Sequence, residues 1–251
     1  MINQTKKLEG KVAIVTGASK GIGAGIAKAF AEEGASVVVN YAGDKESANN
    51  VVNEITAKGG KAIVVHADVS KEEDVKNMFE KTYEAFGGLD ILVNNAGVFK
   101  SIPIEQITVE EFNRHYNINV LGNLLATREA VKYFGAKGGN IINMTSVVSE
   151  KGVPTYSIYS GTKGAIQTIT HALAAELGPK KIRVNAIAPG AIETEGTQVD
   201  FAGDVAEQYI KATPLGRMGY PVDVAKVAVF LACDDSAFLA DSRIEVSGGL
   251  K

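Results

Sequence analysis

The chain has 251 residues, of which 45% are hydrophobic and 22% are charged, and its formal net charge is −3. This composition is ordinary for a globular protein. The acidic balance excludes the basic surface that binding to nucleic acid or to an anionic membrane would require. A single cysteine, Cys233, excludes a disulfide within the chain, and the three histidines lie in no zinc-binding motif, so we expect no metal site.

The sequence carries no pattern typical of a leader or of a membrane span. Met1–Gly10 is polar and lacks an apolar core. No run of about 18 apolar residues occurs, which is the length that a spanning helix needs. Because linkers and repeats are also absent, we expect residues 1–251 to form one domain, and the lone cysteine fits a cytoplasmic location.

Short apolar runs rich in β-branched residues alternate with helical patterns along the chain. The runs predict strands at Val12–Thr16, Val37–Asn40, Ala62–His66, Ile91–Val93, Ile141–Met144, Arg183–Ala188 and Arg243–Val246. Helical spacing predicts helices at Ile22–Glu33, Ser47–Lys58, Ser157–Leu177 and Val222–Ala232, a helix capped by Ser70 and Glu73 that runs to Phe86, and a long helix over Val109–Ala136 interrupted near Asn119. Gly196–Ala212 is predicted to be a polar, mobile segment. The alternation predicts an α/β fold in which helices cover both faces of a parallel sheet.

A glycine-rich turn follows the first predicted strand and opens the first predicted helix. It runs from Gly17 to Gly23 with the spacing G-x3-G-x-G. Glycine allows positive φ angles and a close approach of the backbone to a diphosphate, and a helix N-terminus supplies free N–H groups. A tight turn without a ligand would look the same, but the position in a strand–helix unit favours a dinucleotide site. The candidate cofactor residues of this turn are Gly17, Ser19, Lys20, Gly21, Ile22 and Gly23.

Four further motifs follow in order along the chain. They are Asn94-Asn95-Ala96-Gly97 after the fourth strand, Asn119 within Asn-Ile-Asn-Val-Leu-Gly, Ser146 with Tyr159 thirteen positions later and then Lys163, and Pro189-Gly190 with Thr194. Together with the glycine turn, this set resembles the short-chain dehydrogenases/reductases over nearly the whole chain. The resemblance implies a single-domain Rossmann fold with a doubly wound, seven-stranded parallel sheet. It also implies reversible hydride transfer between a nicotinamide cofactor and a carbonyl compound or alcohol.

Tyr159 and Lys163 are four residues apart on a predicted helix, so their side chains share one face. A tyrosine is a poor base at neutral pH, and a neighbouring ammonium is expected to lower its pKa. Tyr159 then exchanges a proton with the substrate oxygen, although the same spacing also occurs in ordinary surface pairs. The resemblance implies that Ser146 holds the substrate oxygen, that Asn119 positions a water beside the lysine, and that Lys163 also binds the nicotinamide ribose.

The choice between NAD and NADP depends on the residues that follow the second strand. Asn40 and Tyr41 stand where a carboxylate would favour NAD, and Lys20 supplies a cation in the glycine turn, so we favour NADP(H). Asp44 keeps NAD(H) possible if it folds back toward the ribose, and Lys20 is alternatively a solvated surface residue. The resemblance implies further cofactor contacts from Asp68, Val69, Asn95, Ala96, Gly97, Pro189, Gly190, Ile192 and Thr194.

The substrate is expected to lie among Val98–Ile102, Val147–Tyr156 and Ala191–Ile210, whose aliphatic and aromatic residues suit an apolar or aromatic ketone. Reduction of a ketone is therefore the main hypothesis. The alternatives are a 3-oxoacyl-[acyl-carrier-protein] reductase, whose acidic carrier Lys137 and Lys180 would attract, a sugar or secondary-alcohol dehydrogenase, and a non-catalytic NADP-binding sensor. The resemblance also implies a homotetramer. One departure from the family pattern is Ala240-Asp241, where relatives carry Thr-Gly.

Overall fold

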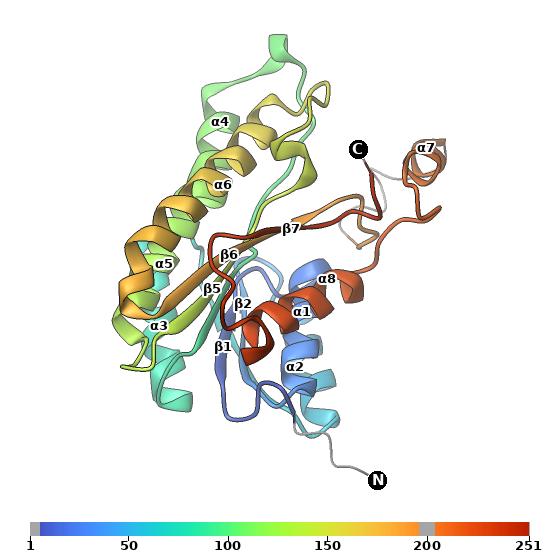
Figure 1. Cartoon of the computed structure of the whole chain (residues 1–251). Helices are drawn as coiled ribbons and strands as arrows, with labels where there is room; N and C mark the ends of the chain where they lie inside the picture. The colour runs from blue at the N-terminus through green and yellow to red at the C-terminus, as the bar shows by residue number, and fades with distance from the viewer. Residues whose placement is uncertain (1–5, 196–203, 251) are drawn as a thin grey trace.

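A single parallel sheet organises the computed structural model, which describes residues 6–195 and 204–250 (Figure 1). Its seven strands have the order β3-β2-β1-β4-β5-β6-β7. They are β1 (Val12–Val15), β2 (Ser36–Tyr41), β3 (Lys61–His66), β4 (Ile91–Asn94), β5 (Gly139–Met144), β6 (Ile182–Pro189) and β7 (Arg243–Val246). All seven predicted strands are confirmed, with ends that differ by at most two residues.

Helices cover both faces of this sheet, which confirms the predicted doubly wound arrangement. In Figure 1, α1 (Gly21–Glu32), α2 (Lys45–Ala57) and α8 (Pro221–Ala232) lie on one face. The other face carries α3 (Glu72–Phe86), α5 (Gly122–Tyr133) and α6 (Ser157–Leu177), with α4 (Val109–Tyr116) beside the upper part of α6. No helix among the described residues is long and apolar enough to cross a membrane.

The core lies in two layers, one on each side of the sheet. Because strand side chains alternate between faces, Val15 packs into the layer that contains Phe30 of α1. Its neighbour Ile14 packs into the opposite layer with Phe79 of α3. Each of these four side chains is at most 1% exposed. The strands are therefore apolar on both faces, which is why they appear in the sequence as continuous apolar runs.

The strand order places a crevice at the carboxyl ends of β1 and β4. The chain runs outward from β1 through β2 to β3 at the sheet edge and then returns to pair β4 with the other side of β1. A reversal of this kind leaves room between the loops that leave the two strands, and ligands of open α/β sheets bind there. The glycine turn and the Asn94–Gly97 motif are these two loops.

The predicted interruption near Asn119 is a π-helical turn, Asn117–Leu121, between α4 and α5. Such a turn widens the helix locally and often occurs at functional sites. The amide of Asn119 is turned toward the loop after β4, where its Oδ1 accepts the N–H of Val98 at 2.8 Å. The prediction of one interrupted helix over this region is confirmed, and it ends at Tyr133.

The predicted capping of α3 is wrong. The residue before the helix is Lys71, which makes no side-chain capping hydrogen bond. Ser70 instead donates its hydroxyl to Asp68 Oδ1 at 2.7 Å, and the carboxylate of Asp74 accepts the N–H of Asp68 at 2.9 Å. Because this turn uses the Ser70 hydroxyl, the helix starts at Glu72 and Glu73 completes no capping box.

The predicted mobile segment Gly196–Ala212 needs a partial correction. Its second half forms a helix, α7 (Asp204–Ala212). The side chains of Ala206 and Tyr209 pack against a small buried cluster of Ala191, Met218 and Leu250, which stabilises the helix. The first half of the segment, with Phe201, lies outside the described residues.

The unusual Ala240-Asp241 pair lies in the turn before β7. Asp241 has a φ of 61°, a left-handed conformation that glycine adopts without cost. Its carboxylate lies 2.5 Å from Nδ1 of His171 on α6. The turn therefore places an aspartate in a left-handed conformation, and the side chain of that aspartate contacts His171.

A buried network of asparagines joins both central strands to two helices. Asn143 of β5 accepts hydrogen bonds through Oδ1 from Asn94 at 3.0 Å and from Asn123 at 2.9 Å. Its Nδ2 donates to Thr170 Oγ1 at 2.9 Å. All four residues are at most 6% exposed, so the side chain of Asn143 links β4, β5, α5 and α6 in the interior.

We expect Asn143→Ala to lower the free energy of unfolding by about 3 kcal/mol, because it removes one hydrogen bond from each of three buried polar groups. Urea unfolding followed by circular dichroism measures this loss. Asn53→Ala on the exposed side of α2 is the control and should leave the midpoint nearly unchanged. Equal midpoints for Asn143→Ala and the wild type would contradict the structural role of the network.

Candidate active site

A cavity of about 980 Å³ lies at the carboxyl ends of the central strands. It is large enough for a dinucleotide with a small substrate and is lined by loops that follow β1 to β6. The predicted site residues that line it are Gly17, Ser19, Lys20, Gly21, Ile22, Gly23, Asn40, Asp68, Val69, Asn95, Ala96, Gly97, Ser146, Tyr159, Lys163, Pro189, Gly190, Ile192 and Thr194. The topology therefore brings together segments spread over nearly 180 positions of the chain.

Two predicted site residues are not part of the cavity lining. Tyr41 is 8% exposed and packs into the core, with its ring centroid 5.4 Å from that of His66. Asn119 lies behind the lining, where its Nδ2 donates to the carbonyl of Val98 and to Thr162 Oγ1, each at 3.0 Å. Asn119 thus holds the loop that forms the cavity wall, whereas Tyr41 has a place only in the core.

The glycine turn leaves no room for side chains. Gly17 and Gly21 have φ angles of 60° and 58°, which other residues rarely adopt. A Cβ atom on Gly17 would lie 2.9 Å from Cα of Ala96, and one on Gly23 would lie 2.5 Å from the carbonyl oxygen of Gly17. The backbone of the turn is therefore in direct contact with the loop after β4 and with itself.

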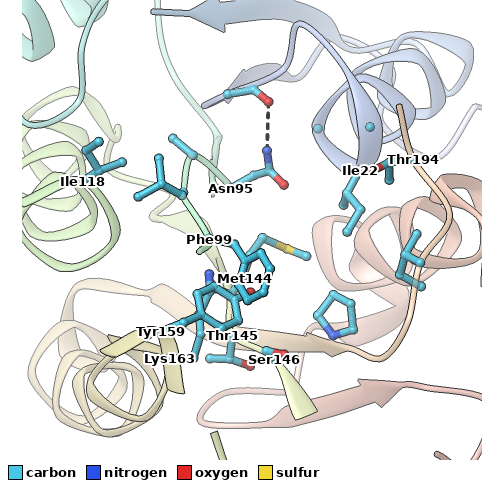
Figure 2. Close-up of a pocket in the computed structure, with 18 of the residues that line it drawn as sticks. Ile22, Asn95, Phe99, Ile118, Met144, Thr145, Ser146, Tyr159, Lys163 and Thr194 are labelled. Atoms are coloured by element: carbon cyan, nitrogen blue, oxygen red, sulfur yellow. Dashed lines mark hydrogen bonds between the residues drawn. The ribbon is translucent and has the colours of Figure 1, made fainter. Parts of the chain in front are cut away.

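Two asparagines hold this turn in place. Oδ1 of Asn40 accepts the N–H of Gly17 at 3.0 Å, and its Nδ2 donates to the carbonyls of Val65 and Ala67. Asn95 donates its Nδ2 to the carbonyl of Gly17 at 3.0 Å, a contact between neighbouring loops that Figure 2 marks. Because the polar atoms of Asn40 are occupied in this way, its side chain supports the turn rather than offering a contact to a ligand.

The N-terminus of α1 points its first N–H groups toward an anion. Lys20 precedes the helix and makes no side-chain capping hydrogen bond. The N–H of Gly21 instead donates to the carboxylate of Glu195 at 3.1 Å. Helix N-termini bind carboxylates and phosphates through the same groups and the same partial positive charge. The residues of the turn therefore fit a diphosphate, and Glu195 shows that they accept a negative charge.

Ser146, Tyr159 and Lys163 lie together at the other end of the cavity. Figure 2 shows them near Phe99, with Ile22 and Thr194 on the far side. Tyr159 and Lys163 are one turn apart on α6, and the ammonium of Lys163 lies 5.6 Å from the centroid of the Tyr159 ring. Nζ of Lys163 donates to the carbonyl of Met144 at 2.8 Å. Ser146 lies two residues after Met144, the last residue of β5. The end of β5 therefore positions Ser146 directly and the two α6 side chains through the contact with Lys163.

Burial controls the ionisation of Tyr159 and Lys163. It raises the pKa of Tyr159 to about 12, and a hydrogen bond with Ser146 acts weakly in the opposite direction. Burial also lowers the pKa of Lys163 to about 8. The expected lowering of the tyrosine pKa by the lysine is therefore not seen in the protein alone, because desolvation of the phenolate dominates. Near neutral pH, Tyr159 is a protonated phenol that can donate a hydrogen ion.

An aromatic wall borders the phenol of Tyr159. The ring centroid of Phe99 lies 5.0 Å from that of Tyr159 and 4.8 Å from that of Tyr156, in edge-to-face contacts. Of the predicted substrate stretches, Val98, Phe99, Val147, Val148, Lys151, Gly152, Val153, Tyr156, Ala191, Ile192, Thr194 and Tyr209 line the cavity. Lys100, Ser101 and Ile102 do not, because the chain turns away after Phe99.

The sequence argument did not assign the roles of Met144, Leu250 and Glu195 in the site. Met144 supplies the backbone oxygen that holds Lys163, and Leu250 closes the cavity from the end of the chain. Glu195 provides the carboxylate at the start of α1. The position of Met144 at the end of a predicted strand was a usable signal, since such ends meet at the ligand edge. Neither Leu250 nor Glu195 belongs to a motif that would have singled it out.

Comparison with known proteins agrees with this geometry. A family model described as enoyl-(acyl carrier protein) reductase matches residues 17–251. An oxidoreductase of Methylorubrum extorquens is 53% identical over 98% of this chain and 99% of its own, and versicolorin reductase of Emericella nidulans is 41% identical over 97% and 96%. The structure of a short-chain dehydrogenase from Burkholderia cenocepacia in complex with NADP has a TM-score of 0.93 and 34% identity, covering 97% of this chain and 99% of that one. The chain belongs to the short-chain dehydrogenase/reductase family, whose members bind NAD(H) or NADP(H).

Proposed function

We propose that the protein reduces an apolar, aromatic ketone to a secondary alcohol with NADPH, using Tyr159 as the general acid. The observation that carries this proposal is the convergence of Ser146, Tyr159 and Lys163 in the same cavity as the anion-binding turn of α1. Reductase-named relatives support the reaction class, since versicolorin reductase aligns over nearly the full length of both chains.

The catalytic side chains act on the carbonyl oxygen of the substrate. Ser146 donates a hydrogen bond to that oxygen and holds it beside the phenol of Tyr159. When bound, the reduced nicotinamide supplies the hydride that adds to the carbonyl carbon. Tyr159 gives its proton to the oxygen as negative charge develops there, which completes the alcohol. A pKa near 12 in the protein alone keeps this proton in place until the substrate oxygen can accept it.

Lys163 and Asn119 support the proton transfer from behind the tyrosine. A Cβ atom on Gly97 would lie 3.3 Å from Oδ1 of Asn119 and 3.7 Å from Nζ of Lys163, so both polar groups lie close to Gly97. A positive charge on Lys163 favours the tyrosinate that remains after transfer. We infer that a water positioned by Asn119 returns a proton through Lys163.

We expect Tyr159→Phe to lower kcat at least about 1,000-fold, in line with the upper range for loss of a general acid, while the dissociation constant for NADPH changes less than about threefold. Initial rates at 340 nm with an aromatic ketone measure turnover, and fluorescence titration measures cofactor binding. Tyr133→Phe, on α5 and away from the cavity, is the matched control. Retention of substantial activity by Tyr159→Phe would rule out this mechanism.

The residues around the end of β2 support NADP(H) over NAD(H). Position 40 cannot offer an acid to the ribose, since the amide of Asn40 points inward to two carbonyls. Asp44 caps α2, with its carboxylate accepting hydrogen bonds from the N–H and the hydroxyl of Ser47 at 3.0 and 2.8 Å, which lowers its pKa. Lys20 lines the cavity at this end and supplies a cation for a 2′-phosphate.

Replacing Lys20 tests this preference. We expect Lys20→Ala to raise KM for NADPH about tenfold, equivalent to about 1.4 kcal/mol, and to change KM for NADH less than twofold. Lys45→Ala, at the exposed start of α2, should leave both values unchanged. The preference for NADPH would be misassigned to Lys20 if the two cofactors were affected equally.

Glu195 occupies a donor that the diphosphate would use, so its carboxylate should compete with the cofactor. We expect Glu195→Gln to lower the dissociation constant for NADPH about threefold, because the variant removes a negative charge from the start of α1. Glu193→Gln, an exposed neighbour, is the control. Fluorescence titration at low salt measures the dissociation constant for NADPH of both variants. Weaker binding by Glu195→Gln would show that the carboxylate favours cofactor binding instead.

The positions of Lys137 and Lys180 do not favour the alternative of a reductase for carrier-bound acyl groups. Lys137 and Lys180 precede β5 and β6, so they lie at the amino ends of these strands. The cavity opens at the carboxyl ends, on the opposite edge of the sheet. An acidic carrier attracted by these lysines would be held far from the cavity, and the aromatic wall favours a ketone with a flat apolar body instead.

We also infer a homotetramer from exposed apolar side chains on the elements that the family resemblance implicates. Phe112, Leu121 and Leu124 on the α4–α5 unit are between 38% and 44% exposed. Phe238, just before β7, is fully exposed. Exposed apolar side chains that gather into one patch mark surfaces that associate, so these residues are candidates for the subunit contacts.

A further inference from the structure

The two ends of the cavity differ in charge. The carboxylates that line it are Asp44 and Asp68, which follow β2 and β3 and therefore lie at the outer, adenosine end. The end that holds Tyr159 is lined by two cations, Lys151 and Lys163, and by no carboxylate among the described residues. Lys163 has a catalytic place, whereas the proposed mechanism gives Lys151 no role.

Two carboxylates in the neighbourhood of Lys151 form ion pairs with another cation. Glu150 and Glu245 lie 3.5 and 2.8 Å from the guanidinium of Arg243, which is 13% exposed. Within the described part of the chain, Lys151 forms no ion pair of its own within 4.0 Å. The positive charge of Lys151 helps to lower the pKa of Glu245, but no carboxylate of the described residues contacts its ammonium, which lines a cavity with largely apolar walls.

The backbone holds this ammonium at the cavity wall. Nζ of Lys151 donates to the carbonyl of Leu250 at 2.6 Å. The N–H of Leu250 in turn donates to the carbonyl of Ser247 at 3.1 Å, so the end of the chain is itself fixed. An ammonium has three N–H donors, and one contact with a neutral carbonyl leaves two of them to meet an acceptor in the cavity. The group is positioned before any ligand arrives.

We propose that Lys151 binds a carboxylate carried by the ketone substrate, which makes it the specificity-determining residue at this end of the cavity. The inference rests on the proposed function, because it names a feature of the molecule that Tyr159 protonates. The aromatic wall of Phe99 and Tyr156 takes the flat body of the substrate, and the ammonium pairs with its anionic end. A charge-assisted hydrogen bond in a largely apolar setting strongly favours the acid over a neutral analogue.

Matched ketones with and without the charge test this assignment. The probes are 3- and 4-acetylbenzoate, their methyl esters, and acetophenone, each with saturating NADPH. We expect the wild type to prefer the better acid over its ester about tenfold in kcat/KM. Lys151→Gln should remove this preference, mainly by raising KM for the acid, and should leave kcat/KM for the ester within about twofold. Lys151→Arg should restore most of the preference, since it returns the charge.

A matched control separates a local effect from a general one. Lys100→Gln removes a neighbouring lysine that pairs with Glu111 at 2.7 Å and does not line the cavity. It should leave the preference for the acid intact. Binding of the acetylbenzoates, followed by calorimetry without turnover, should be about tenfold weaker in Lys151→Gln than in the wild type.

The outcomes separate this inference from the proposed function. Equal rates for acid and ester in the wild type, or an equal loss of both in Lys151→Gln, would overturn the role of Lys151 while reduction itself stands. If no ketone is reduced, acetophenone included, the proposed function fails. Calorimetry then still decides the binding role, since unchanged affinity of Lys151→Gln for the acids overturns it.

Discussion

The hydrogen bond from Lys163 to the carbonyl of Met144 fixes the arrangement on which the rest of the site depends. It places an ammonium that is 6% exposed at the end of a central strand, at 2.8 Å from a backbone oxygen. Burial of a cation is costly unless it meets such an acceptor, so α6 can pack against the sheet only in the register that provides it. That register sets Tyr159 one turn away and brings it beside Ser146, which leaves the same strand end.

Asparagines serve the same purpose elsewhere in the site, by imitating backbone groups where the strands have ended. Asn40 and Asn95 hold the glycine turn, and Asn119 pairs with both backbone groups of Val98 as a neighbouring strand would. Each amide both accepts and donates, so it satisfies loop groups that no ladder can reach. In the proposed complex with NADP(H), main-chain N–H groups and Lys20 are therefore the groups of this turn that meet the cofactor, while these asparagines support the loops.

The parts of the structure that could be predicted are those that burial determines. The strands and α6 could be located because continuous apolar runs and helical spacing reflect the face each element buries. The motif residues could be gathered because strand ends share one edge. The inward orientation of the Asn40 amide, the contact of Glu195 with Gly21 and the first residue of α3 could not be predicted. Each depends on which of several nearby polar groups forms a particular hydrogen bond. The raised pKa of Tyr159 was missed because the sequence names the neighbouring charge but not the depth of burial.

The charges of the site are consistent with a proton donor that works beside an anionic substrate. A carboxylate near Tyr159 would by itself raise the pKa of the phenol further and oppose the tyrosinate that forms on transfer. Lys151 and Lys163 together compensate two negative charges, one brought by the substrate and one left by the departing proton. The acidic residues that line the cavity lie at the other end. There the carboxylate of Asp44, which caps α2, is close to the cation of Lys20. Acidic and basic residues therefore line opposite ends of one cavity. The adenosine part of the cofactor and the reacting part of the ligands lie in different electrostatic environments, as the chemistry at each end requires.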